Sequence, residues 1–93
     1  MNAVTPLTAL KIRIRAMLES DLPQVLMIDQ QSFSMPWPLS AYHYELRVNP
    51  ESLLWVAETE AADGSREVIG MIVVWFVVDE AHIATIAVDP RYR

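Results

Sequence analysis

The segment Arg66–Val78 is the feature that most constrains how this 93-residue chain can fold. Apolar residues occupy both alternating sets of its positions, so a strand here has an apolar surface on each face. Such a strand needs cover over both faces, which predicts a central place in a sheet. Residues 81–88 follow as another strand that is small and apolar on both faces. The fold must therefore accommodate two consecutive strands without a polar face.

The remaining elements indicate an α/β (α+β) domain in the order β-α-α-β-β-β, with helices packed on a mostly antiparallel sheet. Lys11, Arg13 and Arg15 alternate with apolar residues, which predicts a first strand with a solvated cationic face. Asp21 and Gln24 have the spacing of a capping box, which predicts the start of a helix. The predicted bounds are 10–17, 53–58, 66–78 and 81–88 for the strands, and 21–32 and 39–48 for the helices.

These elements leave part of the sheet without cover. The two predicted helices are short, although the second is expected to direct Tyr42, Tyr44 and Leu46 at the sheet. Two such helices cannot cover both faces of four strands. The fourth strand also has nothing after it to pair with, and an open apolar edge favours association. We therefore expect either further chain beyond Arg93 or a partner, with self-association through the fourth strand as one form of it.

Composition excludes several kinds of partner and site. Twelve acidic and seven basic residues give a net charge of −5, which argues against nucleic acid because phosphate binding needs clustered cations. The chain has no Cys, and His43 and His82 lie on different predicted elements, so no metal site is expected. Gly64 and Gly70 do not form a phosphate-binding glycine loop. No apolar run reaches the roughly 20 residues of a membrane-spanning helix, so we expect a cytoplasmic protein without a membrane partner.

Four stretches of the chain resemble one enzyme family. They are Ile14-Arg15-Ala16-Met17 with Asp21-Leu22-Pro23, then Phe33-Ser34-Met35-Pro36-Trp37, then Asn49-Pro50, and finally the long block VVDEAHIATIAVDPRYR from Val77 to Arg93. Over about residues 12–93 the chain is similar to GNAT-fold N-acetyltransferases, and within them to the ribosomal-protein-alanine N-acetyltransferases. The terminal block is the most specific of these motifs.

The resemblance implies the N-terminal half of the GNAT acyl-CoA N-acyltransferase fold. Residues 1–10 are then a disordered lead-in, and residues 11–93 are a partial domain that stops before the acetyl-CoA pyrophosphate loop. In the complete enzyme an acetyl group passes from acetyl-CoA to the N-terminal amine of a protein, expected to be an alanine of a small-subunit ribosomal protein. The catalytic base and acid of the family are expected beyond Arg93, so the resemblance implies no catalytic residue in this chain and no activity of the chain alone.

The resemblance also suggests binding residues. Backbone groups of Ile86, Ala87 and Val88 are expected to bind the acetyl-CoA co-substrate, and Arg93 matches the first position of the phosphate loop. The acceptor protein N-terminus is expected to contact Phe33, Trp37 and Tyr42. From the residues alone, an ordinary buried strand is the favoured explanation of Ile86–Val88, whereas packing of the loop on the sheet explains Phe33, Trp37 and Tyr42 equally well. A GNAT enzyme with another amine acceptor and a non-catalytic binding module that uses its open edge strand remain alternatives.

Overall fold

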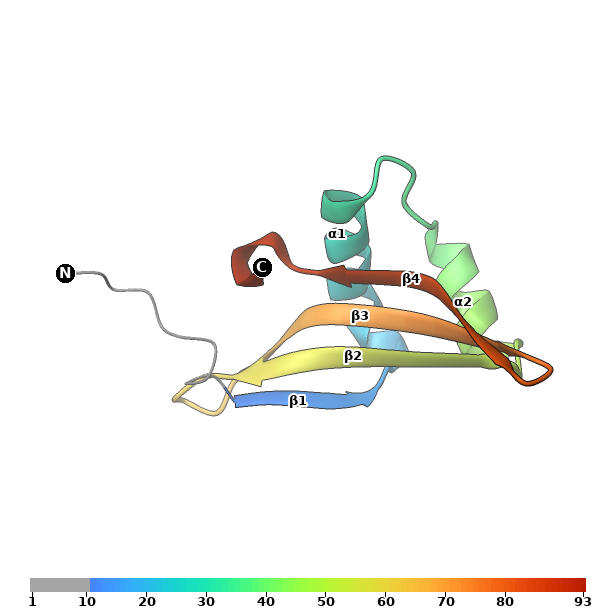
Figure 1. Ribbon diagram of the computed structural model, residues 1–93. Coiled ribbons are helices and arrows are strands. Elements are labelled where there is room, and N and C mark those ends of the chain that lie inside the picture. Colours follow the sequence, from blue (N-terminus) through green and yellow to red (C-terminus); the bar gives the residue numbers. More distant parts are fainter. Residues whose placement is uncertain (1–10) are drawn as a thin grey trace.

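The computed structural model describes residues 11–93 as one sheet with two helices (Figure 1). The elements follow the predicted order β-α-α-β-β-β, which is therefore confirmed. Their bounds are β1 Lys11–Ala16, α1 Leu22–Ser32, α2 Leu39–Arg47, β2 Ser52–Glu60, β3 Arg66–Val77 and β4 Glu80–Val88, with short 3₁₀ turns at Glu19–Asp21 and Pro90–Tyr92. The predicted lead-in, residues 1–10, lies outside the described residues. No helix between residues 11 and 93 is long and apolar enough to cross a membrane.

The four strands form one antiparallel sheet in the order β1-β2-β3-β4. The central position predicted for β3 is confirmed, because β2 and β4 flank it on either side. Ile69 of β3 and Ala84 of β4 are each an extra residue opposite a shorter partner, and such bulges bend and twist a strand. The β3–β4 reversal falls on Val78, which has a positive φ of 58°, so Glu80 already belongs to β4 rather than to the turn.

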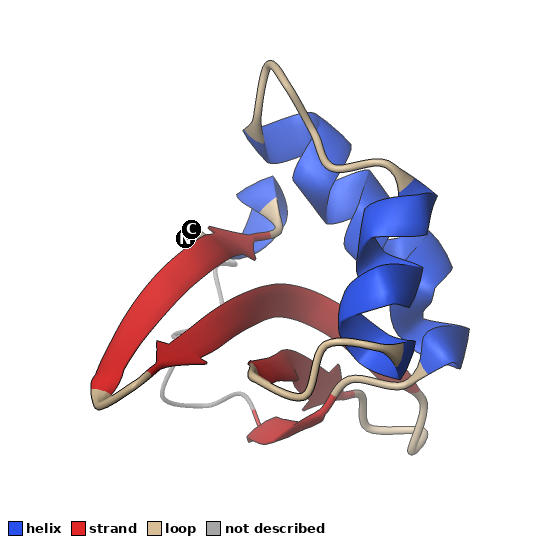
Figure 2. Ribbon diagram, turned by 90° about the vertical axis from the view of Figure 1, so that its right-hand side faces the viewer, coloured by secondary structure: helices blue, strands red, loops and turns tan. Residues whose placement is uncertain are grey.

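Both helices lie on the same side of the sheet, as Figure 2 shows. Between them and the strands is the apolar core: Met17, Leu22, Val25, Ile28, Tyr42, Leu54, Val56, Val68, Met71, Val73 and Ala87. The α1 contribution to this core follows the helical spacing of its apolar residues. Of the three α2 residues predicted to face inward, Tyr42 is buried and Leu46 is partly buried. Tyr44 faces solvent, so that prediction is wrong.

The opposite side of the sheet has an apolar row and no helix. Strand pairing aligns Ile14, Ala57, Gly70 and Val88 across all four strands, so their side-chain positions share one face. Gly70 allows the close approach there, because a Cβ on it would lie 3.3 Å from the Ala87 carbonyl oxygen. The row lines a shallow hollow of about 170 Å³, and its rim includes Trp55 and other exposed apolar side chains.

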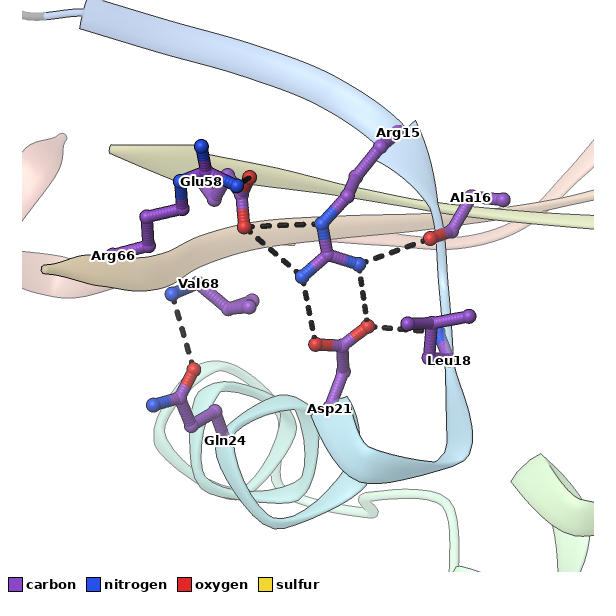
Figure 3. Close-up of polar contacts among 8 residues, drawn as sticks. All are labelled: Arg15, Ala16, Leu18, Asp21, Gln24, Glu58, Arg66 and Val68. Carbon is purple, nitrogen blue, oxygen red and sulfur yellow. Dashed lines mark hydrogen bonds and ion pairs between the residues drawn. The ribbon is translucent and has the colours of Figure 1, made fainter. Parts of the chain in front are cut away.

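A buried ionic cluster joins β1, β2 and the start of α1 (Figure 3). The Arg15 guanidinium donates to both carboxylate oxygens of Asp21, at 2.8 and 2.9 Å, and to Glu58 at 3.0 Å. These hydrogen bonds hold the pKa of Asp21 below its usual range, although burial opposes the shift. The cationic face predicted for β1 is thus not wholly solvated, because Arg15 is drawn under the helix.

The predicted capping box is also wrong in its hydrogen bonds. Asp21 stands at the N-cap position, but its carboxylate accepts from the Leu18 backbone N–H at 2.7 Å rather than from the first turn of α1. Gln24 instead accepts from the Val68 backbone N–H at 3.0 Å and so ties α1 to β3. Both side chains of the pattern therefore fix the helix against the sheet, a use that local sequence spacing does not indicate.

Candidate functional site

The edge of β4 is the first component of the site. One side of β4 pairs with β3, and no strand between residues 11 and 93 pairs with the other side. The Ala84 bulge lies in the middle of this strand, where Thr85 pairs with Val73 and Ile83 pairs with Val74. A bulge interrupts the regular ladder, and bulges occur often beside active sites. The edge therefore carries backbone donors and acceptors that a bound extended molecule could use.

The direction of these backbone groups follows from the ladder. The Asp89 N–H donates to the Ile69 carbonyl at 2.7 Å, so that pair is the hydrogen-bonded kind. Because the two kinds of pair alternate in an antiparallel ladder, Ala87 also directs its N–H and C=O at β3. Ile86 and Val88 then direct theirs outward, to the free edge. Of the three predicted residues, two face the edge through their backbone, whereas Ala87 is buried in the core.

Arg93 lies beside the same edge. Its Nε donates to the Val88 carbonyl at 2.9 Å, and its Nη2 donates to the Ser32 hydroxyl at 2.8 Å. The guanidinium therefore joins the C-terminal end of β4 to the last turn of α1. One of the outward groups of β4 is thus already bonded, and a molecule that uses the Val88 carbonyl has to displace Arg93.

The second component is a hollow between the α1–α2 loop and β4. Its volume is about 280 Å³, and its lining is Phe33, Ser34, Met35, Trp37, Ala84 and Thr85. The loop thus meets β4 at the bulge, two residues before the outward backbone of Ile86. Most of this lining is apolar, with hydroxyl groups only on Ser34 and Thr85. Such a surface suits an uncharged side chain at the entrance to the β4 edge.

The predicted acceptor residues do not all line this hollow. Phe33 and Trp37 do, whereas Tyr42 is fully buried behind the loop. The Tyr42 hydroxyl donates to Asp29 Oδ2 at 2.6 Å, and its ring lies 5.3 Å from that of Trp37. Burial, assisted by the bond to the Asp29 carboxylate, raises the pKa of Tyr42 well above its usual range. Tyr42 therefore stays protonated and supports Trp37 from behind.

A second set of contacts links the loop residue Trp37 to Trp75 and Trp75 to Glu45. Trp75 of β3 stacks on Trp37 with ring centroids 6.3 Å apart, and its indole N–H donates to the buried Glu45 carboxylate. His82 of β4 pairs with Trp75 and is exposed. Among residues 11–93, no three His, Cys, Asp or Glu side chains gather as a metal site.

Sequence reasoning missed three features of the site. Ala84 and Thr85 belong to the hollow because of a bulge, for which a run of small apolar residues carries no signal. Ser34 joins them through the loop. Asp29, a carboxylate within the apolar helix α1, is fully buried beneath the loop. An acid beside Ile28 in a core-facing helix was the one available signal, because buried carboxylates are rare unless paired.

Known proteins are similar to this chain in sequence or architecture over part of their length. A Bacillus subtilis protein provisionally described as a ribosomal protein bS18-alanine N-acetyltransferase is 32% identical over 83 residues, which are 89% of this chain and 52% of that protein. The crystal structure of the ribosomal-protein-S18-alanine N-acetyltransferase from Escherichia coli matches with a TM-score of 0.69 and 23% identity, over 89% of this chain and 49% of that one. This chain thus spans about half the length of these relatives.

A fungal structure has the same fold as one region of a multi-domain protein. It is a GCN5-related glucosamine N-acetyltransferase region within a multi-domain β-N-acetylglucosaminidase, matched with a TM-score of 0.65 and 17% identity over all of this chain and 11% of that one. The model of the acetyltransferase (GNAT) family matches residues 22–93, from the start of α1 through β4 and the 3₁₀ turn after it. The chain belongs to the acetyltransferase (GNAT) family.

Proposed function

We propose that this chain supplies the acceptor-side half of an acetyltransferase domain, with acetyl-CoA bound along the free edge of β4. The observation that carries the proposal is the junction between two components. The outward backbone groups of Ile86 and Val88 adjoin, through the Ala84 bulge, the hollow lined by Phe33 and Trp37. A donor bound along the edge and an acceptor in the hollow would meet at the bulge.

The edge of β4 fits the pantetheine arm of acetyl-CoA in its chemistry. That arm is extended and carries amide groups, so it can pair with an open strand as an added strand does. Ile86 supplies a free N–H and C=O at the edge, and Val88 supplies an N–H. A backbone N–H near the bulge is also suited to stabilise the oxyanion that forms when an amine attacks the thioester carbonyl. Arg93 has to leave the Val88 carbonyl before that group can take part.

The acceptor that we propose is the N-terminal amine of a protein, an alanine of a small-subunit ribosomal protein. The support is the 32% identity to a relative whose description names this acceptor. The neutral amine would attack the acetyl carbonyl after loss of a proton, and the CoA thiolate would leave and take up a proton. We assign neither the base nor the acid to a residue between 11 and 93, and we expect no turnover by this chain alone.

Amide chemical shifts of the ¹⁵N-labelled chain test the donor site. Titration with acetyl-CoA should shift the amides of Ile86 and Val88 while leaving Ile12, on the far strand β1, unchanged. A titration with desulfo-CoA separates binding from any acetylation of the chain itself. Saturable shifts confined to another surface, or none at millimolar acetyl-CoA, would contradict the proposed donor site.

A second titration tests the acceptor. A hexapeptide that begins with alanine and has a free amine should shift the amides of Phe33 and Trp37, and the same peptide with an acetylated N-terminus should bind more weakly. Glucosamine serves as the competing acceptor, and stronger binding of the sugar would overturn the protein acceptor. A mass-spectrometric assay tests whether the chain alone is active. Acetylated peptide formed by the chain with acetyl-CoA would overturn the proposal that the chain supplies only half of the acetyltransferase domain.

A further inference from the structure

Asp29 makes contacts that its own helix does not need. It lies in the last part of α1 and is fully buried. Its Oδ2 accepts from the Tyr42 hydroxyl at 2.6 Å and from the Trp37 backbone N–H at 3.2 Å. Its backbone carbonyl accepts from the Phe33 N–H at 3.0 Å, which is the last backbone hydrogen bond of α1 and owes nothing to the side chain. The Asp29 side chain thus bonds to the C-terminal part of the loop 33–38 and to the helix that follows it.

A carboxylate at this position lowers the stability of the folded chain. The C-terminal end of a helix carries partial negative charge, so an acid there is unfavourable. Asp29 Oδ1 is buried without a hydrogen-bond partner, which adds the desolvation cost of an unpaired polar atom. The core stability of α1 therefore does not explain the residue. What the carboxylate accomplishes is to accept from two donors that come from separate segments.

Both donor residues bear on the lining of the hollow, because Trp37 is part of that lining and Tyr42 packs against Trp37. Trp37 bonds directly to Asp29, and Tyr42 supports the Trp37 ring from behind. On its other side the Trp37 ring stacks on Trp75 at 22° between planes. Without the Asp29 carboxylate the Trp37 N–H loses its acceptor, and the loop that carries Phe33 is free to shift away from Ala84.

We infer that Asp29 is a positioning residue that holds the loop 33–38 in the shape required to admit an acceptor. This inference rests on the proposed function, because it takes the hollow to be the acceptor pocket. Asp29 lines neither the hollow nor the β4 edge, so its effect on binding passes through Trp37 and Phe33. The same geometry makes the Trp37–Trp75 pair a spectroscopic reporter of the loop.

Asp29→Asn tests the inference in the full chain. The amide keeps the size of the side chain but is a weaker acceptor for two donors. We expect the near-ultraviolet circular dichroism of the Trp37–Trp75 pair to diminish and the affinity for the alanine hexapeptide to fall about tenfold, the scale of one hydrogen bond to a charged group. Asp79→Asn is the matched control, because it removes an exposed carboxylate at the β3–β4 turn, and it should change neither reading.

Tyr42→Phe supplies the second variant. It keeps the buried ring and removes only the hydroxyl, so it should produce smaller changes of the same sign even if Asp29→Asn unfolds. A merely structural Asp29 would lower the denaturant midpoint while the Trp37 signal and the peptide affinity stay at wild-type values in water, and that result would overturn the inference. If the wild-type chain does not bind the peptide, the proposed acceptor fails, whereas the Trp37 signal still decides whether Asp29 positions the loop.

Discussion

The two faces of the sheet are built from the same kinds of residue but differ in burial, because the helices cover only one of them. On the covered face, Val56, Met71 and Val73 are nearly inaccessible beneath the helices. On the open face, Ile14 and Ile86 keep more than half of their surface in contact with solvent. Alternation along each strand assigns neighbouring apolar residues to these two faces in turn. Burial is therefore decided by which face the helices reach, and not by the hydrophobicity of the residue.

The difference also explains where polar groups are tolerated. The covered face contains Arg15 and Glu58, and the helix above it contains Asp29; each of the three has charged or hydrogen-bonding partners. The open face has an almost wholly apolar hollow around Gly70. Exposed apolar side chains that adjoin one another across neighbouring strands are typical of interaction sites. The covered face thus holds the fold together, whereas the open face remains available for cover.

The largest expected effect comes from truncating a side chain on the covered face. Met71→Ala should lower the free energy of unfolding by about 2–5 kcal/mol, because it removes buried contacts and leaves a cavity. Ile14→Ala is the matched control on the open face and should cost less than about 1 kcal/mol, since the side chain is already mostly exposed. Urea unfolding measures both. Equal losses would show that the open face is covered in solution.

Removing the cation of the buried ionic cluster should have the next largest effect. Arg15→Met leaves the Asp21 and Glu58 carboxylates buried without their main partner. We expect a loss of about 2 kcal/mol, below the full cost of breaking a buried pair because Arg15 is partly exposed. Arg13→Met, two residues earlier on the same strand, is the control and should stay within about 0.5 kcal/mol. A loss as small for Arg15→Met would refute a stabilising role for the cluster.

The same cluster predicts an acid dependence of stability. The pKa of Asp21 is lower in the folded protein than in the unfolded chain, because Arg15 hydrogen-bonds to its carboxylate. The resulting stabilisation is fully present above about pH 4, the ordinary pKa of aspartate, and is lost as the pH falls below it. Asp21→Asn should therefore lose less stability than wild type between pH 7 and pH 3. Asp79→Asn should behave like wild type, and an identical acid loss in Asp21→Asn would contradict this assignment.

The smallest expected change in stability concerns the open face itself. Ile14→Thr keeps a β-branched residue in β1 and removes exposed apolar surface, so the free energy of unfolding should change by no more than about 0.5 kcal/mol. Binding of an apolar fluorescent dye should nevertheless decrease. Size-exclusion chromatography over a range of concentrations tests self-association, which the open β4 edge leads us to expect. A monomer that binds no dye would contradict the view of this face as an interaction surface.

Much of the fold could be predicted from local patterns. The order of elements and the central place of β3 follow from alternation and from the length of the apolar segment, which the structure confirms. The motifs around Phe33 and Trp37 point to the loop that lines the hollow. The bulge at Ala84 could not be predicted, because its cause is the pairing with β3 rather than the local sequence. Tyr44 was misplaced because helical spacing alone does not say how far the apolar stripe extends.

The sequence by itself determined the elements, their order and the family, since these depend on periodicity and on contiguous motifs. Only the tertiary structure decided which polar residues are buried and what they hold. Asp21 and Gln24 read as a local cap, but Asp21 bonds to Arg15 of β1 and Gln24 to Val68 of β3, because the sheet offers donors that compete with the first turn of the helix. Asp29 reads as one acid in a helix and becomes the common acceptor of Trp37 and Tyr42. Such roles depend on contacts between segments, which no local pattern records.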